Sequence, residues 1–338
     1  MNDNNASLPE EVTPAPPTHS IFFGPNGLRA GWSLLIYIAI LAAFVFSARL
    51  IVGIVHHHHA PAPAHKSSAP VEQSPLAALL GEGIPFLLIA AASWIMSRIE
   101  RRPVGVYGLG GQRKIPHFFS GLAAGVIFLS ILVFALTSSG LLVFDSRLLF
   151  GTNILRYGAL WLFGFLLVAL LEDYLFRGYL QFTLARGLTG LFETCLPAPR
   201  SQALGFWSAA FLISLLFGFA HGSNPGESPI GLLSVVVAGL IFCLSLWRTG
   251  SLWWAIGFHT SWDWAQSFLY GVADSGTMIK FHLFATHPVG KPLLSGGATG
   301  PEGSLYLLPV MALIFAVIVF TLPKDGAHED LWLERDER

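Results

Sequence analysis

The sequence predicts an all-α fold, a polytopic membrane helix bundle of about eight transmembrane helices. Of its residues, 53% are hydrophobic and only 12% are charged, whereas roughly a quarter are charged in a typical soluble domain. The mean hydropathy is +0.61. Apolar windows of about 20 residues, the length that crosses a bilayer, recur along most of the chain. Composition and window length together indicate a multi-span membrane protein.

Eight apolar windows follow a polar start. Residues 1–20 are polar and proline-rich, and they lack the basic segment, apolar core and cleavage site of a signal peptide, so we expect a disordered N-terminal tail. The expected spans are 31–55, 76–97, 117–143, 157–186, 203–221, 230–247, 251–271 and 304–322. These group into N-terminal transmembrane helices at 21–150, a core at 151–272, an outer loop at 273–303, and a last transmembrane helix with a polar tail at 304–338.

Basic residues predict the orientation, because cytoplasmic loops of membrane proteins are enriched in Lys and Arg. Twelve basic residues fall on one side of the expected bundle: Arg29, Arg98, Arg101, Arg102, Arg113, Lys114, Arg186, Arg200, Arg248, Lys324, Arg335 and Arg338. Five fall on the other: Lys66, Arg147, Arg156, Lys280 and Lys291. We therefore expect both termini in the cytoplasm and the segments 56–75 and 272–303 outside.

Several classes of partner are disfavoured by composition. A net charge of -1 offers no basic stripe for nucleic acid. Cys195 lies in an expected loop and Cys243 in a span, so neither a disulfide framework nor a cysteine metal site is indicated.

The run His56 to His59 could bind metal or sense acid, but its low-complexity surroundings favour a solvated His/Pro/Ala spacer. Nothing in the sequence indicates an oligomeric state.

Three expected spans carry ionisable residues that a membrane helix does not need. Glu172 lies in the fourth span, His221 in the fifth, and His259 with Asp263 in the seventh. A charged residue at the centre of a membrane helix costs at least ~2.5–3.5 kcal/mol, so such residues usually face the bundle interior and have a function. Counted from the expected span ends at ~1.5 Å per residue, their depths overlap. The sequence therefore predicts a shared pocket between these spans.

Helical spacing arranges these residues further. His259, Asp263 and Gln266 follow at i, i+4 and i+7 and so share one helix face. Asp173 and Arg177 are also four residues apart, which predicts an ion pair. Each residue also has a purely structural interpretation. The Asp173–Arg177 pair could serve solely to balance two charges, and Asp263 could serve solely to fix the tautomer of His259.

Three motifs give the chain a recognisable resemblance. They are Glu172-Asp173-Tyr174-Leu175-Phe176-Arg177, Phe217-Gly218-Phe219-Ala220-His221 and His259-Thr260-Ser261-Trp262-Asp263. In order and spacing they resemble the Glu-Glu-x-x-x-Arg, Phe-x-x-x-His and His-x-x-x-Asn/Asp motifs of the CPBP family, which includes the type II CAAX prenyl proteases and bacteriocin-processing enzymes. The match covers roughly 155–272. Asp173 replaces the second glutamate, and Asp263 stands where asparagine is common.

The resemblance implies an intramembrane endopeptidase whose catalytic core is 151–272 and whose substrates are membrane-associated peptides or proteins. Glu172, helped by His221, would take a proton from the attacking water. His259, with Asp263 beside it, would stabilise the oxyanion. Asp173, Arg177 and Phe217 would support the site. We expect no cofactor, the lipid bilayer as environment, and the plasma membrane of a bacterium as location.

Alternatives come from within and outside the enzyme class. Glu172, His221, His259 and Asp263 could instead supply a zinc site with a bound water, although the His-Glu-x-x-His helix of many zinc proteases is absent. Buried Glu, His and Asp could also form the proton relay of a transporter, or the fold could act as a non-catalytic immunity or scaffold protein. The complete motif set favours metal-free hydrolysis.

Overall fold

The computed structural model describes residues 21–24, 27–57, 72–224 and 226–323. The expected N-terminal tail, His58 and His59, and the polar tail from residue 324 lie outside the described residues. Within the described ranges the protein is a helical bundle, which confirms the predicted fold class. Its long helices are α1 (Ala30–His57), α2 (Pro75–Glu100), α3 (Lys114–Ser138), α4 (Thr152–Asp173), α5 (Gln181–Phe192), α6 (Ala198–His221), α7 (Pro229–Thr249), α8 (Trp253–Trp264) and α10 (Leu307–Thr321).

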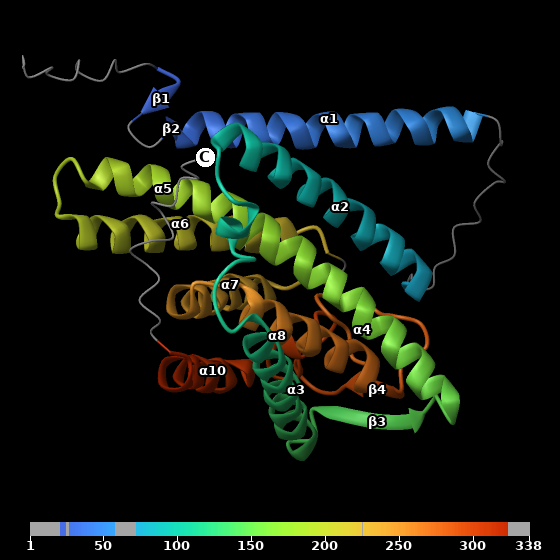
Figure 1. Cartoon of the computed structure of the whole chain (residues 1–338). Helices are drawn as coiled ribbons and strands as arrows, with labels where there is room; N and C mark the ends of the chain where they lie inside the picture. Colours follow the sequence, from blue (N-terminus) through green and yellow to red (C-terminus); the bar gives the residue numbers. More distant parts are fainter. Residues whose placement is uncertain (1–20, 25–26, 58–71, 225, 324–338) are drawn as a thin grey trace, which may run out of the picture.

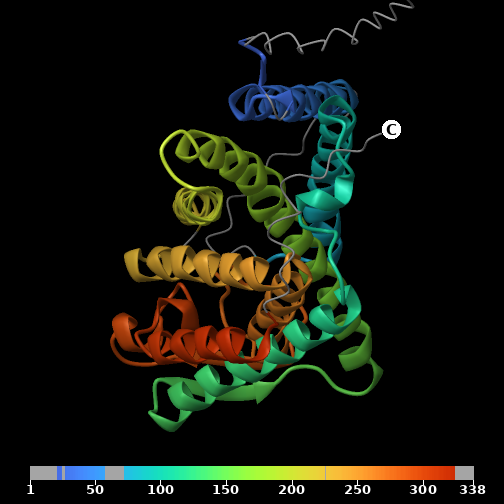
Figure 2. The same cartoon turned by 60° about the vertical axis from the view of Figure 1, so that its left-hand side comes forward.

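Short elements connect these helices. They are β1 (Phe23–Gly24), β2 (Gly27–Leu28), the 3-10 turn η1 (Val104–Tyr107), β3 (Leu142–Arg147), β4 (Phe284–Pro288), the short helix α9 (Pro292–Ser295) and the 3-10 turn η4 (Pro301–Gly303). Two π-helical turns, η2 (Tyr174–Leu180) and η3 (Ala265–Leu269), continue α4 and α8. Both views place α1 at one edge of the molecule and α3, α10 and β3 at the opposite edge (Figures 1 and 2).

Each expected span corresponds to a helix of the bundle. Six helical segments among the described residues are long and apolar enough to cross a membrane; α8 with η3, and α10, are shorter.

Two helices begin where the sequence supplies a serine cap followed by proline. Ser74 accepts a hydrogen bond from the Ala77 N–H, Ser228 accepts one from the Gly231 N–H, and a proline stands at the first helical position in each case.

The fourth helix is longer than expected. In place of the window 157–186, α4, η2 and α5 form one continuous helical segment of 41 residues, Thr152–Phe192. At 1.5 Å per residue it measures about 60 Å, about twice the hydrocarbon core of a bilayer. Figure 1 shows it as one rod across the molecule.

The third window, 117–143, is wrong at its end. Helix α3 stops at Ser138 because Gly140 adopts φ +70°, and the Gly140 and Leu141 N–H groups donate back to the Thr137 and Leu136 carbonyls. This is the Schellman arrangement, which closes a helix. Residues from Leu142 onward instead form β3, which pairs antiparallel with β4. An apolar window does not reveal this pairing, because the partner strand lies far along the chain.

Helices α3 and α8 approach each other unusually closely. A Cβ on Gly121 or Gly125 of α3 would collide with the backbone of α8, and one on Gly257 of α8 would collide with the Phe118 carbonyl. Small residues permit such approach between membrane helices. The largest apolar cluster lies beside this contact, between α3, α7, α8 and α10. Close packing therefore fixes the helix that carries His259 and Asp263.

The connecting segments contact one another in two separate groups, one at each end of the bundle. This is the arrangement expected if successive helices cross the membrane in alternating directions. At one end Arg248 donates to the Leu322 carbonyl, the Leu252 N–H donates to Gly108, and Arg186 pairs with Glu100. Three hydrogen bonds join the segments at the other end. The Gln73 N–H donates to the Met278 carbonyl, the Leu148 N–H to the Leu283 carbonyl, and the Thr299 hydroxyl to the Gly226 carbonyl. These are the two sets of segments that the basic residues separate. Which end faces the cytoplasm stays a prediction.

Cysteine labelling tests the orientation. In Lys291→Cys, the new thiol sits on an exposed position beside α9, and a membrane-impermeant maleimide should modify it in intact cells. The exposed Cys195, between α5 and α6, is the matched control and should react only after permeabilisation, because it lies on the expected cytoplasmic side. Labelling of Cys195 from outside with protection of residue 291 would invert the orientation.

Candidate active site

The first and third motifs lie where an α-helix widens into a π-helical turn. Glu172 and Asp173 end α4 directly before η2, and Asp263 lies two residues before η3. Single π-helical turns within α-helices are found frequently at functional sites. The local backbone therefore marks the same residues that the sequence selects.

One imidazole joins three carboxylates from two helices. His259 Nε2 lies 3.7 Å from Glu172 Oε2 and 3.4 Å from Asp263 Oδ2, while His259 Nδ1 lies 3.4 Å from Asp173 Oδ2. The Asp173 side chain has no exposed surface, whereas that of Glu172 is 22% exposed. Of these two adjacent carboxylates, only Glu172 is thus accessible to a water molecule or a substrate.

Asp173 Oδ1, the oxygen that does not contact His259, forms an ion pair with Arg177. Arg177 Nη1 lies 3.0 Å from Asp173 Oδ1, and both side chains are fully buried, so the ion pair expected from the four-residue spacing is present. The guanidinium carbon lies 3.9 Å from the centre of the Phe217 ring and 5.5 Å from that of Phe242, within cation–π range. Phe217 of the second motif therefore packs on Arg177 of the first.

His221 reaches the site from α6 and contacts Phe217 of its own motif, but not the residues of the other two motifs. Its Nδ1 lies 2.8 Å from the Phe217 carbonyl, an acceptor, so Nδ1 carries the proton and Nε2 is left toward the cavity. No hydrogen bond or ion pair joins His221 to Glu172 or His259 in the part of the chain that the structure describes. The expected help from His221 would have to act across the cavity.

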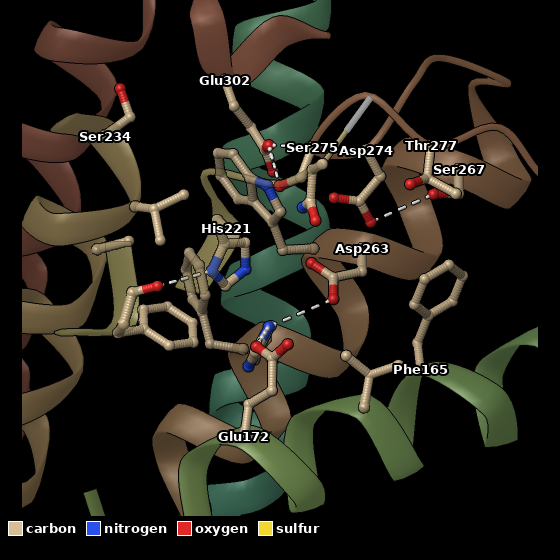
Figure 3. A pocket seen from close by; sticks show the side chains of 18 of the residues that line it. Phe165, Glu172, His221, Ser234, Asp263, Ser267, Asp274, Ser275, Thr277 and Glu302 are labelled. Carbon is tan, nitrogen blue, oxygen red and sulfur yellow. Dashed lines mark hydrogen bonds and ion pairs between the residues drawn. The ribbon is translucent and has the colours of Figure 1, made fainter. Parts of the chain in front are cut away.

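A cavity of about 270 Å³ joins these residues. Its apolar wall comes mainly from α7 and α10, with Val235, Ala238, Ile241, Leu307, Met311 and Ile314. Figure 3 shows the Glu172, His221 and Asp263 side chains turned toward one space, with Asp274 and Glu302 beyond them. The pocket predicted between the fourth, fifth and seventh spans therefore exists, and α7 and α10 contribute to it as well.

Sequence reasoning missed the polar wall formed by the segment 273–303. Asp274, Ser275 and Glu302 line the cavity, and Ser275 donates to Glu302 Oε2 through both its N–H (3.1 Å) and its hydroxyl (3.0 Å). Ser267 donates to Asp274, 3.3 Å away. Burial raises the pKa of the Asp274 carboxyl well above its usual range, and nearby Glu302 raises it further. Acidic residues in an expected loop carry no periodic signal that would have identified them.

The four residues of the zinc alternative come together only in part. Across the described residues, no group of three or more His, Cys, Asp or Glu side chains is placed to hold a metal ion. Of the four candidate ligands, Glu172 and Asp263 both lie beside His259 Nε2, whereas His221 lines the same cavity without contacting them and uses its Nδ1 to bond the Phe217 carbonyl. Tetrahedral zinc needs its ligands within ~2.0–2.3 Å of a single point.

Comparison with known proteins yields one match. Residues 154–265, about one third of the chain, match the family model described as Type II CAAX prenyl endopeptidase Rce1-like. The matched region runs from the start of α4 through α8 to the first residue of η3 and contains all three motifs. No curated protein and no solved structure matches the chain.

Proposed function

We propose that this chain, whose residues 154–265 match the family model described as Type II CAAX prenyl endopeptidase Rce1-like, is an intramembrane endopeptidase of the CPBP family that uses water activated by Glu172. The observation that carries the proposal is the contact of partly exposed Glu172 with His259 Nε2 at the wall of the cavity. A general base and a proton donor lie side by side where a peptide can bind.

In the proposed reaction, the Glu172 carboxylate takes a proton from water while the water oxygen attacks the peptide carbonyl carbon. The carbonyl electrons move to oxygen, and charged His259 donates its Nε2–H to that oxyanion. His259 Nδ1–H meanwhile donates to Asp173 Oδ2, 3.4 Å away, which orients the ring. Collapse of the intermediate breaks the C–N bond, and Glu172 returns its proton to the leaving amine. Arg177 and Phe217 support Asp173 in this arrangement.

His221 and Asp263 receive secondary catalytic roles. His221 Nε2, an acceptor across the cavity, would hydrogen-bond the attacking water. Asp263 lies 3.4 Å from the same His259 nitrogen that would serve the oxyanion, and an ionised aspartate there would repel the oxyanion. We therefore propose that Asp263 holds His259 in its charged, oriented form, or donates a hydrogen bond when protonated.

The cavity suggests the class of substrate. Its apolar wall faces the bundle interior, which suits apolar segments of membrane-associated peptides or proteins, and a prenylated C-terminus is one form of such a substrate. The protein is an integral multi-pass membrane protein; its placement in a bacterial plasma membrane belongs to the proposal.

Comparing protein termini in cells tests the function. Membranes from cells that express the wild type or Glu172→Gln would be labelled at new N-termini and compared by mass spectrometry. Termini present only with the wild type, in apolar or juxtamembrane sequence, are the expected result. Identical termini in both samples would favour a transporter or a non-catalytic immunity or scaffold protein.

Asp263 separates the metal-free mechanism from the zinc form. We expect Asp263→Asn to keep activity within about tenfold of wild type, because the amide still pairs with His259, whereas Asp263→Leu should lose roughly 10²-fold. Purified protein and a quenched peptide substrate would be assayed with and without a chelator. An inactive Asn variant that added zinc rescues, together with chelator inhibition of the wild type, would overturn the metal-free mechanism, because an amide weakens metal binding.

A further inference from the structure

Arg177 lies in a narrow space between the helix that carries it and helices α6 and α7. Only its Nη1 makes a hydrogen bond, to Asp173; Nε and Nη2 have no hydrogen-bond partner among the described residues. The Arg177 side chain is fully buried, and its guanidinium lies against the ring of Phe217. Its position is therefore determined largely by the shape of the space around it.

Gly239, in the middle of α7, forms the wall beside the free edge of this guanidinium. A Cβ at position 239 would lie 3.0 Å from Arg177 Nη2 and 2.8 Å from Ser214 Oγ of α6. Ser214 is itself buried. Glycine weakens a helix interior relative to alanine, so local helix stability does not explain a glycine here. The close approach of Arg177 and Ser214 does.

We propose that Gly239 is a positioning residue of the active site. Without a side chain, it leaves Arg177 the space from which Nη1 reaches Asp173 Oδ1 at 3.0 Å, and Asp173 Oδ2 in turn reaches His259 Nδ1 at 3.4 Å. A methyl group at position 239 pushes the guanidinium away from α7 and so displaces Asp173 and His259. This inference rests on the proposed endopeptidase function only for its effect on catalysis.

The kinetic test is Gly239→Ala, assayed with the quenched peptide. A displacement of catalytic groups by about 1 Å can cost 10²-fold, so we expect kcat to fall roughly tenfold to 10²-fold with little change in KM. Adding Ser214→Gly removes the other side chain that the methyl would meet but leaves Arg177 Nη2 3.0 Å from the new Cβ, so this double variant should keep most of the loss in kcat. Recovery of kcat in the double variant would assign the effect to Ser214 and not to Arg177.

Two other glycines serve as controls. A Cβ added to Gly81 of α2 would have no neighbouring atom within 4 Å, so Gly81→Ala should behave as wild type. Gly205 of α6 packs tightly on Thr189 of α5, away from Arg177, so Gly205→Ala should lower the thermal midpoint but not kcat. An unchanged kcat in Gly239→Ala, a recovery of kcat when Ser214→Gly is added, or an equal loss of kcat in Gly205→Ala would each overturn the proposal.

A second readout does not require activity. If Gly239 acts on Arg177, Gly239→Ala should lower the thermal midpoint of the wild type more than that of Arg177→Met, because contacting residues are not additive. Equal losses in both backgrounds would overturn the proposal. Failure of the endopeptidase function would instead appear as an inactive wild type, or as a Glu172→Gln variant that is as active as the wild type, with this coupling intact.

Discussion

Glu172→Gln is expected to lower peptide cleavage by at least about 10²-fold, because an amide cannot take the proton from water that a general base removes. The substitution keeps the size of the side chain, which is partly exposed to the cavity, 3.7 Å from His259 Nε2. We therefore expect the variant to accumulate in membranes and to unfold at the same temperature as the wild type. The measurement is turnover of a quenched peptide by purified protein.

Glu193→Gln is the matched control, because Glu193 is exposed at the end of α5 and outside the cavity. It should retain wild-type turnover. Activity of Glu172→Gln within about tenfold of wild type would contradict the assignment, since loss of a general base costs more than that. A variant that fails to accumulate would be replaced by Glu172→Asp, which keeps the carboxylate but withdraws it by about one methylene.

The second large effect is on stability. Arg177→Met is expected to destabilise the protein by about 3–5 kcal/mol, because it leaves the fully buried Asp173 carboxylate without its ion-pair partner. Activity should fall as well, since Asp173 Oδ2 contacts His259. The measurements are the thermal midpoint in detergent and turnover of the quenched peptide.

A double variant identifies the cause of that loss. Asp173→Asn combined with Arg177→Met removes both charges, so much of the stability should return, because an uncompensated buried charge is what makes a broken pair costly. Cleavage should stay low, since asparagine is a weaker partner for His259. If the double variant is as unstable as the sum of the two single variants, packing of Arg177 on Phe217 and Phe242, rather than charge, holds this region together.

Features that depend on residues close together in the chain could be predicted without a structure. Apolar windows located the helices, and the four-residue spacing of Asp173 and Arg177 produced their ion pair. The reason is that a helix places residues i and i+4 together whatever the rest of the fold does. The motifs also identified four polar residues that line one cavity, Glu172, His221, His259 and Asp263.

The contacts between these groups depend instead on tertiary packing. The sequence left Asp263 as the natural partner of His259, whereas the structure adds Asp173, 86 positions away, at Nδ1. Asp274 and Glu302 joined the cavity, and β3 paired with β4, through contacts between distant segments. Such contacts depend on how helices pack and how the chain returns, and no local period records them. The close approach of Arg177 to Gly239 belongs to the same class, because it exists only once η2, α6 and α7 are packed together.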